Sequence, residues 1–163
     1  MSLVRFRGKT KLMHFKKGDT THAIRDGGLV KLDDSSNLVP PANDSTDRVI
    51  GVARLNVSLT DTSSWQGAPM VPVEVPVDNA VEWVIDVDSD AGAADSDIGR
   101  YCAIDTTGGG SVLAGDSAGM RVDVSDTAVR QVFITGRQSA TKIVGVIARP
   151  AFVVSGPDTA GAS

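Results

Sequence analysis

A serine between two glycines is the first group in this sequence that could do covalent chemistry. Residues 115–119 read Gly-Asp-Ser-Ala-Gly, which matches the pattern that places a nucleophilic serine on a sharp turn between a strand and a helix. In hydrolases with that pattern a histidine base follows the serine, whereas His14 and His22 both precede Ser117. An order with the histidine first stays formally open, as in other serine proteases. We interpret the segment as a turn between strands and predict no catalytic residue.

Carboxylates at alternate positions are the second candidate. Asp86, Asp88 and Asp90 stand two apart in a segment that ends at Gly92, and calcium loops gather oxygen ligands with such a spacing. An EF-hand would place glycine sixth and a bidentate glutamate twelfth, but here glycine is seventh and Asp97 is twelfth. The pattern favours an acidic, solvated loop, and calcium binding is the alternative.

Phosphate and zinc sites find less support. Residues 7–10 read Arg-Gly-Lys-Thr, like the end of a phosphate-binding loop, but the earlier glycine that such a loop needs would fall on Leu3. His14 and His22 are eight apart, with no ligand partners at a zinc spacing. We predict neither a metal nor a cofactor. Cys102, in the apolar run 101–104, is predicted to be a buried thiol in a reducing cytoplasm.

Charge is distributed unevenly along the chain. Residues 1–18 carry six basic side chains and no acid, so a net charge of −4 for the chain leaves −10 for the rest. We predict a basic extended N-terminal arm over residues 1–18, an all-β domain over 19–154 and a flexible tail over 155–163. The chain contains no run of about 20 apolar residues, so we expect a soluble, unexported protein without a membrane partner.

The arm mixes cations with apolar side chains, which favours a protein partner over nucleic acid. Fully burying a Phe or Leu side chain is worth about 1.5–3 kcal/mol, whereas an exposed ion pair is worth about 0–1 kcal/mol. Apolar burial would therefore dominate and charge would steer, so we predict no direct contact with nucleic acid. The residues predicted to bind the partner are Leu3, Val4, Arg5, Phe6, Arg7, Lys9, Lys11, Leu12 and Phe15.

The elements that must position these residues are strands, because Val, Ile and Thr recur with a period of two between turn-forming clusters. We predict strands near residues 20–25, 28–33, 48–57, 70–77, 81–88, 100–105, 119–125, 130–135 and 142–148, and a last one near 152–154. Residues 91–98 have room for one helical turn. The polar run 33–37 is predicted to be a turn. The chain is thus predicted to be all-β, as a single small barrel-like domain.

Two of these strands have a more specific pattern. Pro72 and Pro76 would point their missing N–H groups toward the same lateral side, which predicts an edge strand open to self-association. In residues 81–87 the side chains of Val81, Trp83, Ile85 and Val87 share one face, with Glu82 and Asp86 on the other, and this apolar face is predicted to enter the core. Self-association is assigned to Val71, Val73, Val75 and Val77, together with Trp65 in a polar loop.

Several segments resemble the capsid decoration, or cement, proteins of tailed bacteriophages. The resemblance covers most of residues 15–148. It rests on Phe-Lys-Lys-Gly-Asp at 15–19, Gly-Leu-Val-Lys-Leu at 28–32, Val-Ile-Gly-Val-Ala at 49–53, Asp-Ile-Gly-Arg at 97–100 and Ile-Val-Gly-Val-Ile at 143–147. It implies a small β-barrel or β-tulip domain, a homotrimer on the outer capsid surface, and a terminal arm that reaches neighbouring major capsid subunits.

The expectation is therefore a non-enzymatic virion protein that binds the major capsid protein after synthesis in the host cytoplasm. Two alternatives stay open: another phage structural protein of the tail or head-completion type, and a β-sandwich module that binds carbohydrate or another ligand. Aromatic residues make up only 4% of the chain, which argues against a carbohydrate-binding surface.

Overall fold

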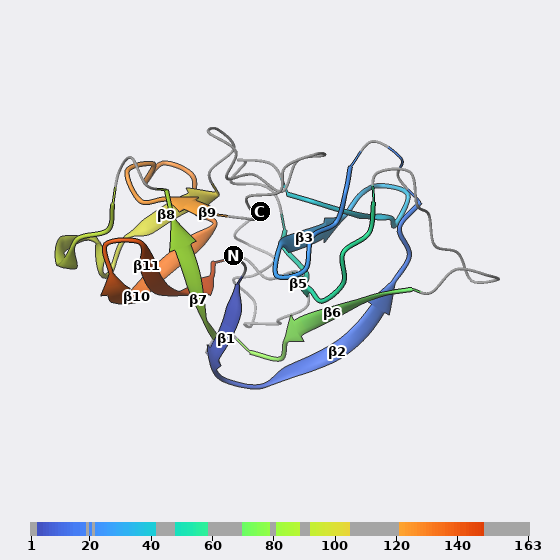
Figure 1. Cartoon of the computed structure of the whole chain (residues 1–163), viewed down its shortest axis with the longest axis horizontal. Helices are drawn as coiled ribbons and strands as arrows, with labels where there is room; N and C mark the ends of the chain where they lie inside the picture. The colour runs from blue at the N-terminus through green and yellow to red at the C-terminus, as the bar shows by residue number, and fades with distance from the viewer. Residues whose placement is uncertain are drawn as a thin grey trace, which may run out of the picture.

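Strands form nearly all of the regular structure and are arranged in two sheets (Figure 1). The computed structural model describes residues 3–18, 20, 22–41, 48–58, 70–78, 81–88, 92–104 and 121–148. The strands are β1 (Val4–Arg7), β2 (Thr10–Phe15), β3 (Leu29–Leu32), β4 (Leu38–Val39), β5 (Gly51–Ala53), β6 (Val71–Pro76), β7 (Glu82–Val87), β8 (Tyr101–Ile104), β9 (Arg121–Asp123), β10 (Val132–Ser139) and β11 (Lys142–Ile147). Within these residues the only helical element is the 3-10 turn η1 (Asp95–Asp97). The predictions of an all-β fold and of a helical turn over 91–98 are confirmed.

The first sheet closes into a five-stranded barrel. Its order is β1-β7-β11-β10-β8-β9, and β9 returns to pair in parallel with β7 at Asp86 and Val87. β11 covers one edge of β7 from Glu82 to Asp86. β1 pairs antiparallel with the first half of β7, at residues 82–84. β1 and β9 therefore share the remaining edge of β7, one after the other.

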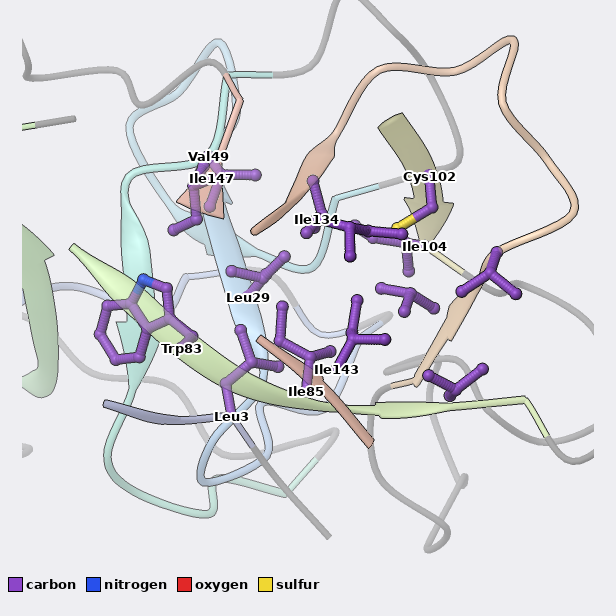
Figure 2. Packing of buried hydrophobic residues seen from close by; sticks show 14 of the residues in the cluster. Leu3, Leu29, Val49, Trp83, Ile85, Cys102, Ile104, Ile134, Ile143 and Ile147 are labelled. Atoms are coloured by element: carbon purple, nitrogen blue, oxygen red, sulfur yellow. The ribbon is translucent and has the colours of Figure 1, made fainter. Parts of the chain in front are cut away.

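One large apolar cluster fills the barrel and extends to Leu29, Val49 and Val52 in and beside the second sheet (Figure 2). Val81, which directly precedes β7, and Trp83, Ile85 and Val87 of β7 alternate inward as predicted, and all are buried. Leu3 at the start of the arm belongs to the same cluster and is 0% exposed. Figure 2 shows its side chain directed into the group that holds Trp83 and Ile85. The arm therefore contributes to the core of its own domain.

The second sheet has the order β2-β6-β5-β3-β4 and covers its own smaller cluster. Val71, Val73 and Val75 of β6 are buried in this cluster, with Met13 and Phe15 of β2 packed against it. β3 and β4 are joined by the predicted turn at 33–37, where the Asp33 carboxylate accepts from the backbone N–H of Ser35 and Asn37. The backbone N–H of Leu38 in β4 donates to the carbonyl of Lys16, just after β2.

The prediction that residues 70–77 form an open edge strand is wrong, because β6 pairs with β2 on one side and β5 on the other. The prolines do share one lateral side. The Pro72 carbonyl accepts from the N–H of Arg54, so the missing N–H groups face β5. β5 is only three residues long and pairs between the two prolines, at Val73 and Glu74, so little of the ladder is lost.

Close approach of β5 to β6 requires Gly51. A Cβ on this glycine would lie 2.2 Å from the carbonyl oxygen of Glu74, which is closer than any side chain can come. Pairing continues from Gly51 and Val52 to Val30 and Leu29 of β3. The glycine is therefore what lets a three-residue strand connect the two halves of this sheet.

Several predicted strands are shorter in the structure. Of the predicted strand at 48–57, the structure has β5 and then an isolated bridge between Val57 and Ile24. The described part of the predicted strand at 20–25 has this bridge as its β pairing. The predicted strand at 152–154 and the tail at 155–163 lie outside the described residues. β10 extends four residues beyond its predicted end, to Ser139, so it forms a long hairpin with β11.

Candidate docking surface

The arm is folded into both sheets, which corrects the prediction that residues 1–18 lie outside an all-β domain beginning at residue 19. β1 and β2 follow one another along one side of the molecule, from the barrel to the second sheet (Figure 1). β1 pairs with β7 and β2 pairs with β6 along its whole length, from Thr10 opposite Pro76 to Phe15 opposite Val71. The chain bends between them at Gly8, whose φ of 101° favours glycine. The arm thus runs antiparallel to the β6–β7 segment and belongs to both sheets.

Backbone and side-chain contacts hold the arm at its start. The Leu3 N–H donates to the carbonyl of Gly27 at 2.9 Å. The Leu3 carbonyl accepts from Nη1 of Arg54 at 2.9 Å. The same guanidinium lies 3.1 Å from Oε1 of Glu74 and 5.9 Å above the centre of the Trp83 ring. Arg54 therefore links the arm, β6 and the barrel core, a role that no local sequence pattern indicated.

Seven of the nine residues predicted to bind a partner lie at the surface. Leu3 is buried and Phe15 is partly buried against the second cluster, so these two residues serve the fold. The others are all exposed along β1 and β2, where neighbouring side chains point to alternate faces of the strand. We call these residues together the basic strip: Val4, Arg5, Phe6, Arg7, Lys9, Lys11 and Leu12. Val4, Phe6 and Leu12 are 52%, 46% and 54% exposed, so the strip is apolar as well as cationic.

The charge of the strip is only partly balanced inside the molecule. Arg7 forms an ion pair with Glu82 at 2.6 Å and lies 5.0 Å above the Phe6 ring. Arg5 donates to the hydroxyl of Thr10. Lys9 and Lys11 form no ion pair within the described part of the chain, and both are exposed. Two cations of the strip are therefore available to an acidic partner.

The residues assigned to self-association are separated by the fold. Val71, Val73 and Val75 face the second core cluster and are at most 4% exposed. Val77 is 51% exposed at the end of β6. Trp65 lies outside the described residues. The three buried valines are unavailable for contact with a second copy because the strand face that carries them is covered by their own domain.

The structure also places the candidate metal and nucleophilic groups. Among the described residues, no three His, Cys, Asp or Glu side chains are grouped so that they could hold a metal ion. Asp86 forms an ion pair with Lys142 at 2.6 Å, and His14 is exposed on β2. Burial raises the pKa of the Cys102 thiol to about 12, with Asp123 and other carboxylates adding to the rise. Ser117 lies outside the described residues.

Comparisons with protein-family models, with curated proteins and with solved structures find no match to this chain. In the residues that the structure describes, no helix is both long enough and apolar enough to cross a bilayer.

Proposed function

We propose that this protein decorates the outer surface of a tailed-phage capsid by binding major capsid subunits through the basic strip. The observation that carries the proposal is the strip itself, in which exposed apolar side chains alternate with cations on strands fixed in two sheets. Apolar contacts would supply most of the binding free energy and the cations would steer the approach. The choice of the major capsid protein as partner comes from the resemblance of the sequence to capsid decoration proteins.

Binding through paired strands differs physically from binding through a free arm. A disordered arm loses conformational entropy when it binds, whereas β1 and β2 are already ordered by β7 and β6. A preformed surface therefore retains more of its interaction free energy. If three copies act together, avidity adds a further factor of about 10² to 10⁴ without any new kind of contact.

A stoichiometry measurement tests the proposal. The protein is produced together with the major capsid protein encoded by the same genome, and assembled shells are purified and quantified by mass spectrometry. Hundreds of copies per shell are expected for a decoration protein. A handful of copies would indicate a portal or tail position, and shells without the protein would contradict the proposal.

Charge reversal identifies the surface. Lys9→Glu with Lys11→Glu should lower shell occupancy at least tenfold, because both side chains are exposed and neither is needed for pairing inside the domain. Arg100→Glu with Arg130→Glu is the matched control, since these exposed cations lie on the barrel, next to β8 and β10. Equal losses in the two variants would show that net charge, and not the strip, controls binding.

A further inference from the structure

The outer edge of β2 has backbone groups that no strand of the described chain uses. The carbonyl of Lys9 accepts from Val77, so odd-numbered residues here direct their backbone groups toward β6 and β7. The carbonyl of Lys16 accepts from Leu38 on the opposite side. Because lateral direction alternates along a strand, Thr10, Leu12 and His14 direct their N–H and C=O groups outward.

Among the described residues, no strand covers most of this edge. β4 covers it only at Lys16, and β2 pairs with β6 in an unbroken register without a bulge. Neither Leu12 nor His14 has a backbone partner on the outer side among the described residues, and both side chains are exposed. An extended, regular and exposed edge of this kind is a template for another strand.

Charge decides between the possible occupants of this edge. Residues 9–15 carry Lys9 and Lys11 and no acid, so pairing two copies edge to edge would bring two cationic strands together. Like charges destabilise a ladder wherever they lie opposite one another. An acidic strand would instead place carboxylates beside these lysines, which have no ion pair in the described part of the chain. The edge therefore favours a strand of opposite charge over self-pairing.

We infer that β2 receives an extended, carboxylate-bearing segment of a partner protein as an added strand. The outward N–H and C=O groups of Leu12 and His14 bind its backbone, Leu12 contacts its apolar side chains, and Lys9 and Lys11 bind its carboxylates. The inference rests on the proposed function and extends it by stating which chemistry of the capsid subunit the basic strip recognises.

Amide hydrogen exchange with a defined probe tests this inference. The probe is a synthetic peptide of alternating valine and glutamate, and its counterpart replaces each glutamate by lysine. In the free protein the amides of Leu12 and His14 should exchange fast, while Lys11 and Met13 are already slowed by β6. Saturating acidic peptide should slow exchange of the Leu12 and His14 amides at least tenfold, and the basic counterpart should leave them unchanged.

Variants separate backbone pairing from simple attraction between charges. Lys9→Glu with Lys11→Glu should weaken binding of the acidic peptide at least tenfold, while Arg100→Glu with Arg130→Glu keeps wild-type affinity. Peptide binding without slower exchange at Leu12 and His14 would overturn strand addition, as would equal protection by the basic peptide. Failure to bind shells with intact peptide binding would instead refute the capsid proposal alone.

Discussion

Arg54 donates from Nη1 to the carbonyl oxygen of Leu3, and its Nε donates to Oε1 of Glu74. This guanidinium therefore satisfies a backbone group of the arm and a half-buried carboxylate of β6 at once. Arg54→Met should lower the free energy of unfolding by about 2 kcal/mol, as expected for loss of hydrogen bonds to a charged group. Urea denaturation measures the change.

A double-mutant cycle with Glu74→Gln separates the two contacts of Arg54. Glutamine in place of Glu74 removes the unpaired carboxylate that Arg54→Met leaves behind, so the double variant should be more stable than the sum of the single changes implies. A coupling free energy near zero would show that the two side chains act independently.

Leu3 tests whether the arm belongs to the fold. Leu3→Ala removes a side chain that is 0% exposed and should cost about 2–5 kcal/mol of stability. Val4→Ala is the matched control, because the side chain of this neighbouring residue is 52% exposed and its loss should change stability by less than about 0.5 kcal/mol. Equal stability of the Leu3 variant and the wild type would contradict the conclusion that the arm is part of the domain core.

Substitution by alanine at two strand glycines, Gly51 and Gly136, should have opposite effects on stability. Gly51→Ala forces a Cβ to within 2.2 Å of the Glu74 carbonyl and should cost at least about 1–3 kcal/mol. At Gly136 the nearest atom to an added Cβ is Cβ of Val144 at 3.6 Å, an ordinary contact. Gly136→Ala should therefore be neutral or stabilise the protein by up to about 1 kcal/mol, through the smaller entropy of the unfolded chain. Thermal denaturation of both variants makes the comparison.

The protein should lose stability at alkaline pH because of Cys102. Its pKa rises from 9.0 to about 12 on folding, so the unfolded chain releases the thiol proton first. This group leaves the free energy of unfolding unchanged below about pH 9 and lowers it by up to about 1.4 kcal/mol per pH unit between the two values. Cys102→Ala should show a shallower decline above pH 9 than the wild type. Parallel pH profiles for the two proteins would contradict the assignment.

Calcium should leave the melting temperature unchanged. Asp86 already forms an ion pair with Lys142 at 2.6 Å. Among the described residues, no three His, Cys, Asp or Glu side chains lie close enough together to hold a metal ion. Differential scanning fluorimetry in millimolar calcium and in chelator compares the two conditions. A rise of several degrees with calcium would show that residues 86–92 form the ion site that the sequence left as an alternative.

Strands whose apolar side chains recur at every second position could be predicted from the sequence, because this pattern is local to each strand. Along β7 buried side chains alternate with more exposed ones, so the sequence pattern predicts correctly that Trp83 and Ile85 lie in the core. The turn at 33–37 follows from side-chain bonds that Asp33 makes to its own loop. Cys102 was likewise predicted to be buried, and it is.

The arm could not be placed in the same way. Val4 and Phe6 alternate with arginines, so the pattern favours burial of these apolar side chains, yet the structure exposes them and buries Leu3 instead. β1 pairs with β7 through a bulge between Arg5 and Arg7, and that partner lies far along the chain. Likewise, Pro72 and Pro76 indicated the correct side of β6, but nothing local shows that three residues of β5 occupy it.

The shared edge of β7 also constrains the order of events during synthesis. Val4 leaves the ribosome early, but its partner Val84 is made much later, and the strand that holds Val84 is itself completed by β11 near the other end of the chain. β1 therefore stays unpaired until β7 has emerged, and β7 gains its second neighbour only when β11 follows. A bulky group attached directly before Leu3 should therefore slow the late step in which β1 pairs with β7.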